Sequence, residues 1–235
     1  MKLSPKIIAF DADDTLWDCQ GHFERVMEQL YEMLTPWVSL RTARDELYAT
    51  ERKNMPLLGY GTKAFTLSMM ETALRVSHYE MSGEQLAELQ EKCYSLLRLP
   101  ATPLPGVEKT LHLLQQRGYR MALFTKGELL DQENKLKRSG LADYFEHIEI
   151  TSDKTEREFR LLCRHLNVEP ASLLMVGNSL RSDVAPALAI GAMAVHIPFH
   201  VTWELENAEP FIHPRLVGIA RIEQLLDIVP ITPQP

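Results

Sequence analysis

The sequence has few cysteines and no long apolar run. The three cysteines among its 235 residues (Cys19, Cys93 and Cys163) are odd in number and far apart, which excludes a disulfide framework and a cysteine-based metal cluster. No apolar stretch approaches the roughly 20 residues that a membrane-spanning helix needs. The first apolar run stops after four residues, at Asp11, so we expect no signal peptide and a reducing, cytoplasmic location.

Basic residues are also in the minority. Lys and Arg number 25 against 32 Asp and Glu, which gives a formal net charge of -7. This balance disfavours a broad surface for nucleic acid or anionic membrane, so we expect neither as a partner. The hydrophobic share of 45% is typical of a globular protein. The length allows one large domain or a core with a smaller module, and it leaves monomer and homodimer open.

Carboxylates are abundant at the end of the first apolar run. Ile7–Phe10 is apolar on both faces, which predicts a strand buried on both sides of a parallel sheet. Asp11, Asp13 and Asp14 follow at once, and three like charges at that spacing are tolerable if a cation lies among them. Open α/β sheets bind ligands at this end of a strand. The stretch therefore predicts a metal-assisted site.

A helical block of about 80 residues follows Trp17. Apolar periodicity predicts four helices, over residues 22–34, 40–53, 62–77 and 83–97. Ser82 and Gln85 have the spacing of a capping box at the start of the fourth, and the stretch from Pro56 to Gly61 breaks the pattern. The proline-rich stretch 99–105 marks a boundary. We therefore predict an all-helical insertion after the first strand.

Helices and strands alternate from Gly106 onward. The pattern predicts helices over 107–116, 129–138, 155–166 and 184–190, and strands over 119–125, 147–151, 173–176 and 192–197. Such repeated units imply an α/β fold with a parallel sheet and right-handed crossovers. Four strand ends then carry polar groups that can converge at one edge of the sheet: Asp11 to Asp13, Thr125 with Lys126, Lys154, and Asn178 to Asp183.

These four segments, in this order, resemble the motifs of the haloacid dehalogenase-like hydrolase superfamily. The resemblance covers residues 6–16 and about 100–200, with Asp11 to Thr15 as the first motif, Phe124 to Gly127 as the second, Lys154 as the third and Gly177 to Asp183 as the fourth. It implies a Rossmann-like three-layer α/β/α core over 1–16 and 101–235, with a helical first-type cap over 17–100. It also implies a Mg²⁺-dependent phosphatase that hydrolyses a small phosphorylated metabolite through an aspartyl phosphate.

The resemblance assigns four catalytic residues. Asp11 is the nucleophile, and Asp13 protonates the leaving alcohol and then deprotonates the attacking water. General chemistry agrees, because a carboxylate can attack phosphorus and divide hydrolysis into two steps. Thr125 can donate a hydrogen bond to the phosphoryl oxygens, and Lys154 can neutralise their charge.

The metal ligands implied by the resemblance are Asp11, the backbone carbonyl of Asp13, Asn178 and Asp183. Asn178 stands where the family usually has an acid, so its amide oxygen would bind Mg²⁺ without charge and Asp183 becomes the principal carboxylate of that segment. Asp14 stands where many members have glycine, and we expect it to form turn or cap hydrogen bonds.

Further candidates lie around these positions. Trp17 and Lys126 are candidate substrate contacts beside the first and second motifs, with core packing as the alternative for Trp17. The spacing of His196, His200 and His213 is too loose for a histidine metal site.

Three other functions share this residue pattern. A haloacid dehalogenase uses the same nucleophile without a metal, although the acidic site suits a cation better. A phosphoaspartate receiver domain would lack the helical insertion. A non-catalytic, ligand-binding member stays open because of Asn178. No motif identifies the substrate or the cap residues that select it.

Overall fold

The computed structural model describes residues 3–231, so the first two and last four residues of the expected core domain lie outside the description. The chain forms two compact units. Met1–Asp18 and Ala101–Pro235 make up the core unit, and Cys19–Pro100 makes up the helical unit. Among residues 3–231, no helix combines the length and apolar character that crossing a membrane requires.

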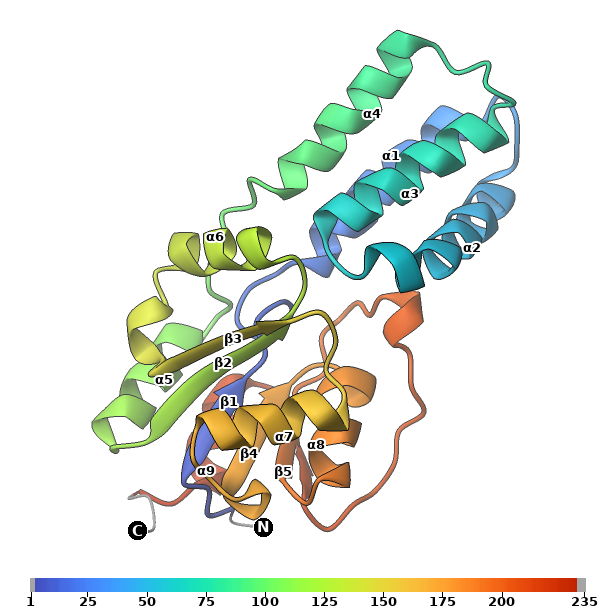
Figure 1. The fold of residues 1–235 in the computed structure, drawn as a ribbon. Coiled ribbons are helices and arrows are strands. Elements are labelled where there is room, and N and C mark those ends of the chain that lie inside the picture. Colours follow the sequence, from blue (N-terminus) through green and yellow to red (C-terminus); the bar gives the residue numbers. More distant parts are fainter. Residues whose placement is uncertain (1–2, 232–235) are drawn as a thin grey trace. The chain divides into compact units, whose positions relative to one another are not determined.

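The core unit is built on a six-stranded sheet with the order β3-β2-β1-β4-β5-β6 (Figure 1). All neighbouring strands are parallel, which confirms the predicted α/β fold. The last of them, β6, was not predicted, because three residues are too few to show a period. The strands are β1 Ile7–Phe10, β2 Arg120–Lys126, β3 His147–Thr151, β4 Leu173–Gly177, β5 Met193–His196 and β6 Leu216–Gly218.

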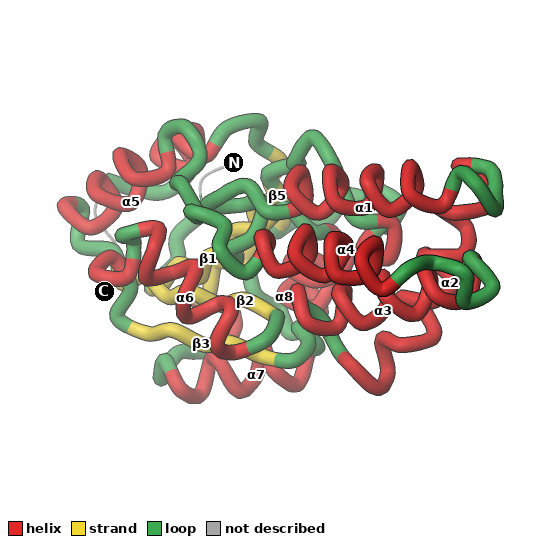
Figure 2. Tube along the Cα trace, turned by 90° about the horizontal axis from the view of Figure 1, so that it is seen from above, coloured by secondary structure: helices red, strands yellow, loops and turns green. Residues whose placement is uncertain are grey.

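Helices cover both faces of the sheet, as Figure 2 shows for α5 and α7. Successive side chains of a strand point to opposite faces. Ile8 and Phe10 of β1 therefore share one apolar cluster with α5 (Val107–Gln116), α6 (Leu129–Ser139) and α9 (Leu225–Ile228). Ile7 and Ala9 share the other with α7 (Glu156–His165) and α8 (Ala185–Ala189). The unbroken apolar run of β1 follows from burial on both faces.

The helical unit contains four long helices around a core of its own. They are α1 Gln20–Leu34, α2 Leu40–Leu58, α3 Thr62–Val76 and α4 Gly83–Leu96. Leu30, Leu47, Met69 and Leu89 are buried at their centre. The Ser82 hydroxyl accepts from the Gln85 N–H, and the Gln85 side chain accepts from the Ser82 N–H, as the capping-box spacing predicted.

The expected end of α2 near residue 53 was wrong. The helix continues through Pro56 to Leu58. Pro56 lacks the N–H that would bond the carbonyl of Arg52, but both residues are exposed, so water can satisfy that carbonyl. The helix ends at Gly59, whose φ of 69° lies in the left-handed region that glycine adopts readily.

The sheet order creates a switch point beside β1. The chain places β2 and β3 on one side of β1, and β4, β5 and β6 on the other. Loops at the carboxyl ends of β1 and its neighbours diverge there, and ligands of open α/β sheets bind in such crevices. All four polar segments found in the sequence lie at this edge of the sheet.

Candidate active site

A buried lysine is at the centre of this edge. Lys154 follows β3, and its Nζ lies 2.5 Å from Asp11 Oδ1 and 2.6 Å from Asp183 Oδ1. Lys154 is 3% exposed and Asp183 is 1% exposed. The ammonium also lies 5.4 Å from the centre of the Phe124 ring, within range of a cation–π interaction. Three residues predicted from separate motifs thus meet in one ion-pair network.

The electrostatics of this network favour an additional cation. Burial and the nearby Asp183 carboxylate raise the pKa of Asp11 to about 7, although Lys154 acts to lower it. Burial alone would lower the pKa of Lys154, but the two carboxylates outweigh burial and raise it. Two carboxylates against one ammonium leave negative charge in a buried site. A cation beside Asp11 would favour its ionised, nucleophilic form.

Thr15 links the first and fourth motifs. Its Oγ1 lies 3.2 Å from Asp11 Oδ2 and 3.2 Å from Asn178 Oδ1. A hydroxyl carries one hydrogen, so it can donate to only one of the two oxygens at a time. Oxygens of Asp11 and Asn178 therefore converge on one point. The place of Thr15 in the first motif was the only signal in the sequence for this role.

A π-helical turn over Leu180–Val184 directs Asp183 back toward the sheet. Asp183 Oδ2 accepts a hydrogen bond of 2.9 Å from the Ser179 N–H. The carboxylate lies so close to Gly177 that a Cβ at that position would overlap it. Only glycine permits this approach. The sequence predicted a regular helix from residue 184 and gave no sign of this turn, a feature often found at functional sites.

Four hydrogen bonds hold the Asp13 carboxylate. Lys135 Nζ lies 2.8 Å from Oδ1 and 2.7 Å from Oδ2. The Trp17 indole N–H donates to Oδ1 at 2.7 Å, and Gln132 Nε2 donates to Oδ2 at 3.2 Å. Burial acts to raise the pKa of Asp13, but the charge of Lys135 and these hydrogen bonds lower it below its ordinary value. Asp13 is thus fixed in orientation and favoured as the anion.

Gln132 and Lys135 were missed as site residues. Lys135 is 3% exposed and pairs with Asp13. Gln132 Nε2 also donates to Thr125 Oγ1 at 2.7 Å, so it connects the second motif to Asp13. Both side chains are buried one turn apart on α6. Gln132 and Lys135 are polar residues on a helix face that should be apolar, and this was the signal available for their role in the site.

Lys126 and Trp17, the two residues predicted to contact substrate beside the motifs, make contacts within the protein. Lys126 donates to Ser182 Oγ at 2.7 Å and pairs with Glu206. Burial by itself would raise the pKa of Glu206. Lys126 and the hydroxyls of Ser179 and Ser182 outweigh burial, so the pKa lies below its ordinary value. Trp17 is 1% exposed within the apolar core, in line with the core-packing alternative. Substrate contact by Trp17 or Lys126 stays a prediction.

The donor set fits Mg²⁺. The ligands expected from the sequence offer oxygen atoms alone: the carboxylates of Asp11 and Asp183, the amide oxygen of Asn178 and the backbone carbonyl of Asp13. Mg²⁺ prefers such hard ligands and binds through one or two carboxylates together with substrate oxygens and water. The carboxylates of Asp11 and Asp183 outnumber the Lys154 ammonium, and the remaining negative charge attracts a cation.

Three relatives of known activity resemble the chain along most of its length. Glyceraldehyde 3-phosphate phosphatase of Pyrococcus furiosus is 27% identical over 212 residues, which cover 86% of this chain and 84% of that one. Phosphoglycolate phosphatase of Vibrio vulnificus is 26% identical over 236 residues, with coverages of 95% and 96%. N-acylneuraminate-9-phosphatase of Homo sapiens is 24% identical over 203 residues, which cover 80% of this chain and 80% of that one.

The fold and the family are also shared. The crystal structure of a haloacid dehalogenase-like family hydrolase from Xanthomonas campestris superposes with a TM-score of 0.85 at 29% identity, covering 94% of this chain and 89% of that one. The family model of the haloacid dehalogenase-like hydrolases matches residues 5–191. The chain therefore belongs to the haloacid dehalogenase-like hydrolases.

Proposed function

We propose that this hydrolase is a Mg²⁺-dependent phosphatase that releases phosphate from a small phosphorylated metabolite through an aspartyl phosphate on Asp11. The observation that carries the proposal is the buried Lys154, which bridges Asp11 and Asp183 at the switch point of the sheet. The similarity to phosphatases of small phosphorylated metabolites supports the same reaction.

In the first step, the Asp11 carboxylate attacks phosphorus and the bond to the leaving alcohol breaks. The alcohol oxygen takes a proton from Asp13. Asp13 therefore enters this step protonated, with the proton that it accepted from water in the preceding turnover. The contacts of Asp13 with Lys135 favour its ionised form, so these contacts must weaken while Asp13 carries the proton. In the second step a water molecule attacks the phosphoryl group, the bond to Asp11 breaks, and Asp13 accepts the proton of the water. The Lys135 contact favours Asp13 as the base of this second step.

Charge on the transferred phosphoryl group needs neutralisation. Lys154 supplies a buried positive charge beside the nucleophile. Thr125 Oγ1 accepts from Gln132, so its own O–H stays available to donate to a phosphoryl oxygen. Mg²⁺, held by Asp11, Asp13, Asn178 and Asp183, would supply Lewis-acid neutralisation.

We further propose that the helical unit acts as a cap. It begins at Cys19, a few residues after Asp13 in the chain. An inserted cap that closes over bound substrate excludes water and favours small molecules over protein substrates.

Phosphate release from a generic aryl phosphate tests the activity, followed by a panel of small phosphorylated metabolites to find the substrate. We expect turnover with Mg²⁺ and its loss in EDTA. Activity that persists in EDTA, or halide release from a haloacid, would contradict the phosphatase proposal. Failure of both activities would leave a non-catalytic role for the chain.

A further inference from the structure

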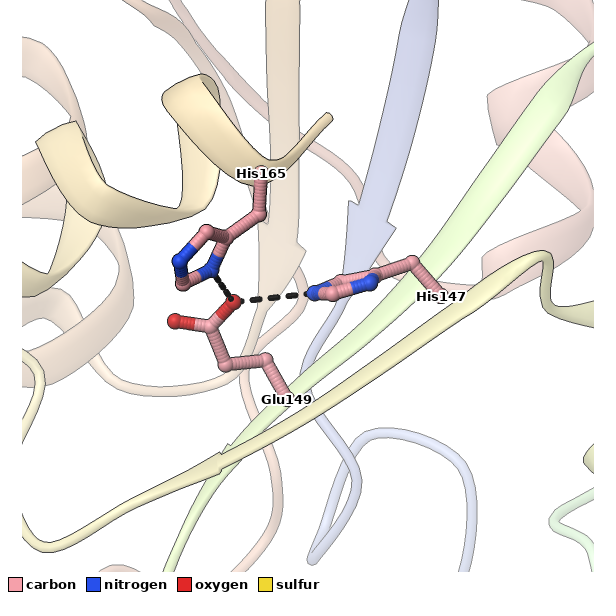
Figure 3. A group of neighbouring side chains, drawn as sticks. All are labelled: His147, Glu149 and His165. Atoms are coloured by element: carbon pink, nitrogen blue, oxygen red, sulfur yellow. Dashed lines mark hydrogen bonds and ion pairs between the residues drawn. The ribbon is translucent and has the colours of Figure 1, made fainter. Parts of the chain in front are cut away.

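A second cluster of ligand-type side chains lies outside the candidate active site. His147 and Glu149 are two residues apart on β3, so their side chains lie on one face of the edge strand. His165 is in the last turn of α7. Figure 3 shows the three side chains directed toward one another. Among the described residues they form a compact group of histidine and glutamate side chains that could hold a metal ion.

The geometry is close to that of a metal site. Glu149 Oε2 lies 2.9 Å from His147 Nε2 and 2.8 Å from His165 Nδ1 (Figure 3). All three atoms lie within 4.8 Å of one another. Ligands about 2.0 to 2.1 Å from a tetrahedral Zn²⁺ are about 3.3 Å apart. An ion could replace the two hydrogen bonds if each lengthened by about half an ångström and the two histidine nitrogens, which lie within 4.8 Å of each other, moved to the same spacing.

The chemistry of the three atoms selects the kind of ion. Two imidazole nitrogens and one carboxylate oxygen suit Zn²⁺ and similar transition-metal ions, whereas Mg²⁺ prefers oxygen alone. His165 lies at the C-terminal end of α7, where the helix dipole also favours positive charge. The side chain of Glu149 is 17% exposed and that of His165 is 51% exposed. An ion can therefore enter, and water can take its fourth position.

We propose that His147, Glu149 and His165 form a second metal site, specific for Zn²⁺ or a similar transition-metal ion. In the metal-free form each nitrogen that faces Glu149 carries a proton, because an ionised carboxylate only accepts hydrogen bonds. When the ion binds, each ring moves its proton to the nitrogen that faces away from Glu149, so both facing nitrogens become ligands. The ion joins the start of β3 to the end of α7. Lys154 lies between these two elements in the chain, and the metal closes the β3–α7 unit at the end opposite to that lysine.

Calorimetric titration with Zn²⁺, in the presence of a large excess of Mg²⁺, tests the site. We expect one equivalent of Zn²⁺ to bind to the full chain and its melting temperature to rise with Zn²⁺ concentration. Glu149→Gln and His165→Gln should each lose the tight equivalent and the thermal shift. His112→Gln is the matched control, since His112 contacts Gln116 elsewhere in the core unit, on α5, and this variant should bind Zn²⁺ like the parent.

Co²⁺ in place of Zn²⁺ gives a readout that does not depend on folding of the variants. Tetrahedral nitrogen and oxygen ligation should give intense visible absorption in the unmodified protein. Absence of a Zn²⁺ equivalent, absence of that absorption, or equal binding by the parent and both variants would overturn the proposal.

Discussion

The β3–α7 unit carries a polar cluster at each end, and the two clusters differ in burial. At one end Lys154 is 3% exposed and bridges two carboxylates of the candidate active site. At the other, His165 has a side chain that is 51% exposed and shares Glu149 with His147. When one member of a buried ion pair is removed, the remaining charge has neither a partner nor water to solvate it. When one member of an exposed pair is removed, water solvates the remaining charge. The same backbone unit therefore carries a rigid, buried charge network at one end and an adaptable, solvent-accessible cluster at the other.

The largest effect is expected from removal of the nucleophile. Asp11→Asn should lower phosphate release by more than about 10³-fold, because the amide cannot form the covalent intermediate. Asp14→Asn is the matched control. Asp14 has a φ of 61°, which asparagine also adopts, so this variant should keep most of the activity. Equal losses in both variants would mean that the loop, rather than one carboxylate, is essential.

Replacing the buried cation should damage both activity and stability. In Lys154→Met, Asp11 and Asp183 face each other without a positive charge. We expect a loss of about 3 to 5 kcal/mol in the free energy of unfolding, as for other broken buried ion pairs, and a large loss of turnover. Urea denaturation measures the first and phosphate release the second. Lys137→Met, at an exposed position of α6, is the control and should change neither by much. A stable Lys154→Met variant would contradict the contrast between the two clusters.

Lys135→Met tests the missed partner of Asp13. The Asp13 side chain is 27% exposed, so water can compensate in part and we expect a smaller stability loss of about 1 to 3 kcal/mol. Turnover should fall about 10-fold or more, because Asp13 loses its fixed orientation. Unchanged turnover would show that the Lys135 contact contributes to folding alone.

Gly177→Ala tests the close approach of Asp183. The added Cβ would displace the Asp183 carboxylate and with it one contact of Lys154. We expect overpacking to cost about 1 to 3 kcal/mol and the apparent affinity for Mg²⁺ in the activity assay to weaken. Gly118→Ala, where the added Cβ meets nothing but φ is positive, should cost stability without changing Mg²⁺ dependence.

The smallest effect is expected at the exposed end of the unit. Without Zn²⁺, His165→Gln should lower the free energy of unfolding by less than about 1 kcal/mol, as for other exposed pairs. Urea denaturation in EDTA gives this value. A larger loss would show that the histidine cluster stabilises the fold even in the absence of metal.

Local patterns were sufficient to predict the parallel sheet and the four polar segments. Burial of β1 on both faces produces an apolar run, and every carboxyl end of a parallel strand lies at the same edge of the sheet. Asp11, Lys154 and Asp183 could be brought together on that basis alone. The helical insertion was similarly visible, because apolar periodicity is a local property.

Contacts made by side chains away from the strand ends were not predictable in this way. Lys135 and Asp13 are 122 residues apart in the sequence, and the period of α6 does not show which distant residue a buried polar side chain contacts. The histidine cluster joins a strand to the end of the next helix, so its spacing matches no short motif. The π-helical turn before Asp183 and the continuation of α2 through Pro56 depend on packing and hydration, which composition does not encode.

Chemical trapping of the covalent intermediate tests the central claim most directly. Borohydride reduces an aspartyl phosphate to homoserine, which mass spectrometry locates in the sequence. During turnover of an aryl phosphate with Mg²⁺, we expect homoserine at position 11 in the parent protein and none in Asp11→Asn. Turnover without modification at position 11, or modification of Asp13 or Asp183 in its place, would contradict the account.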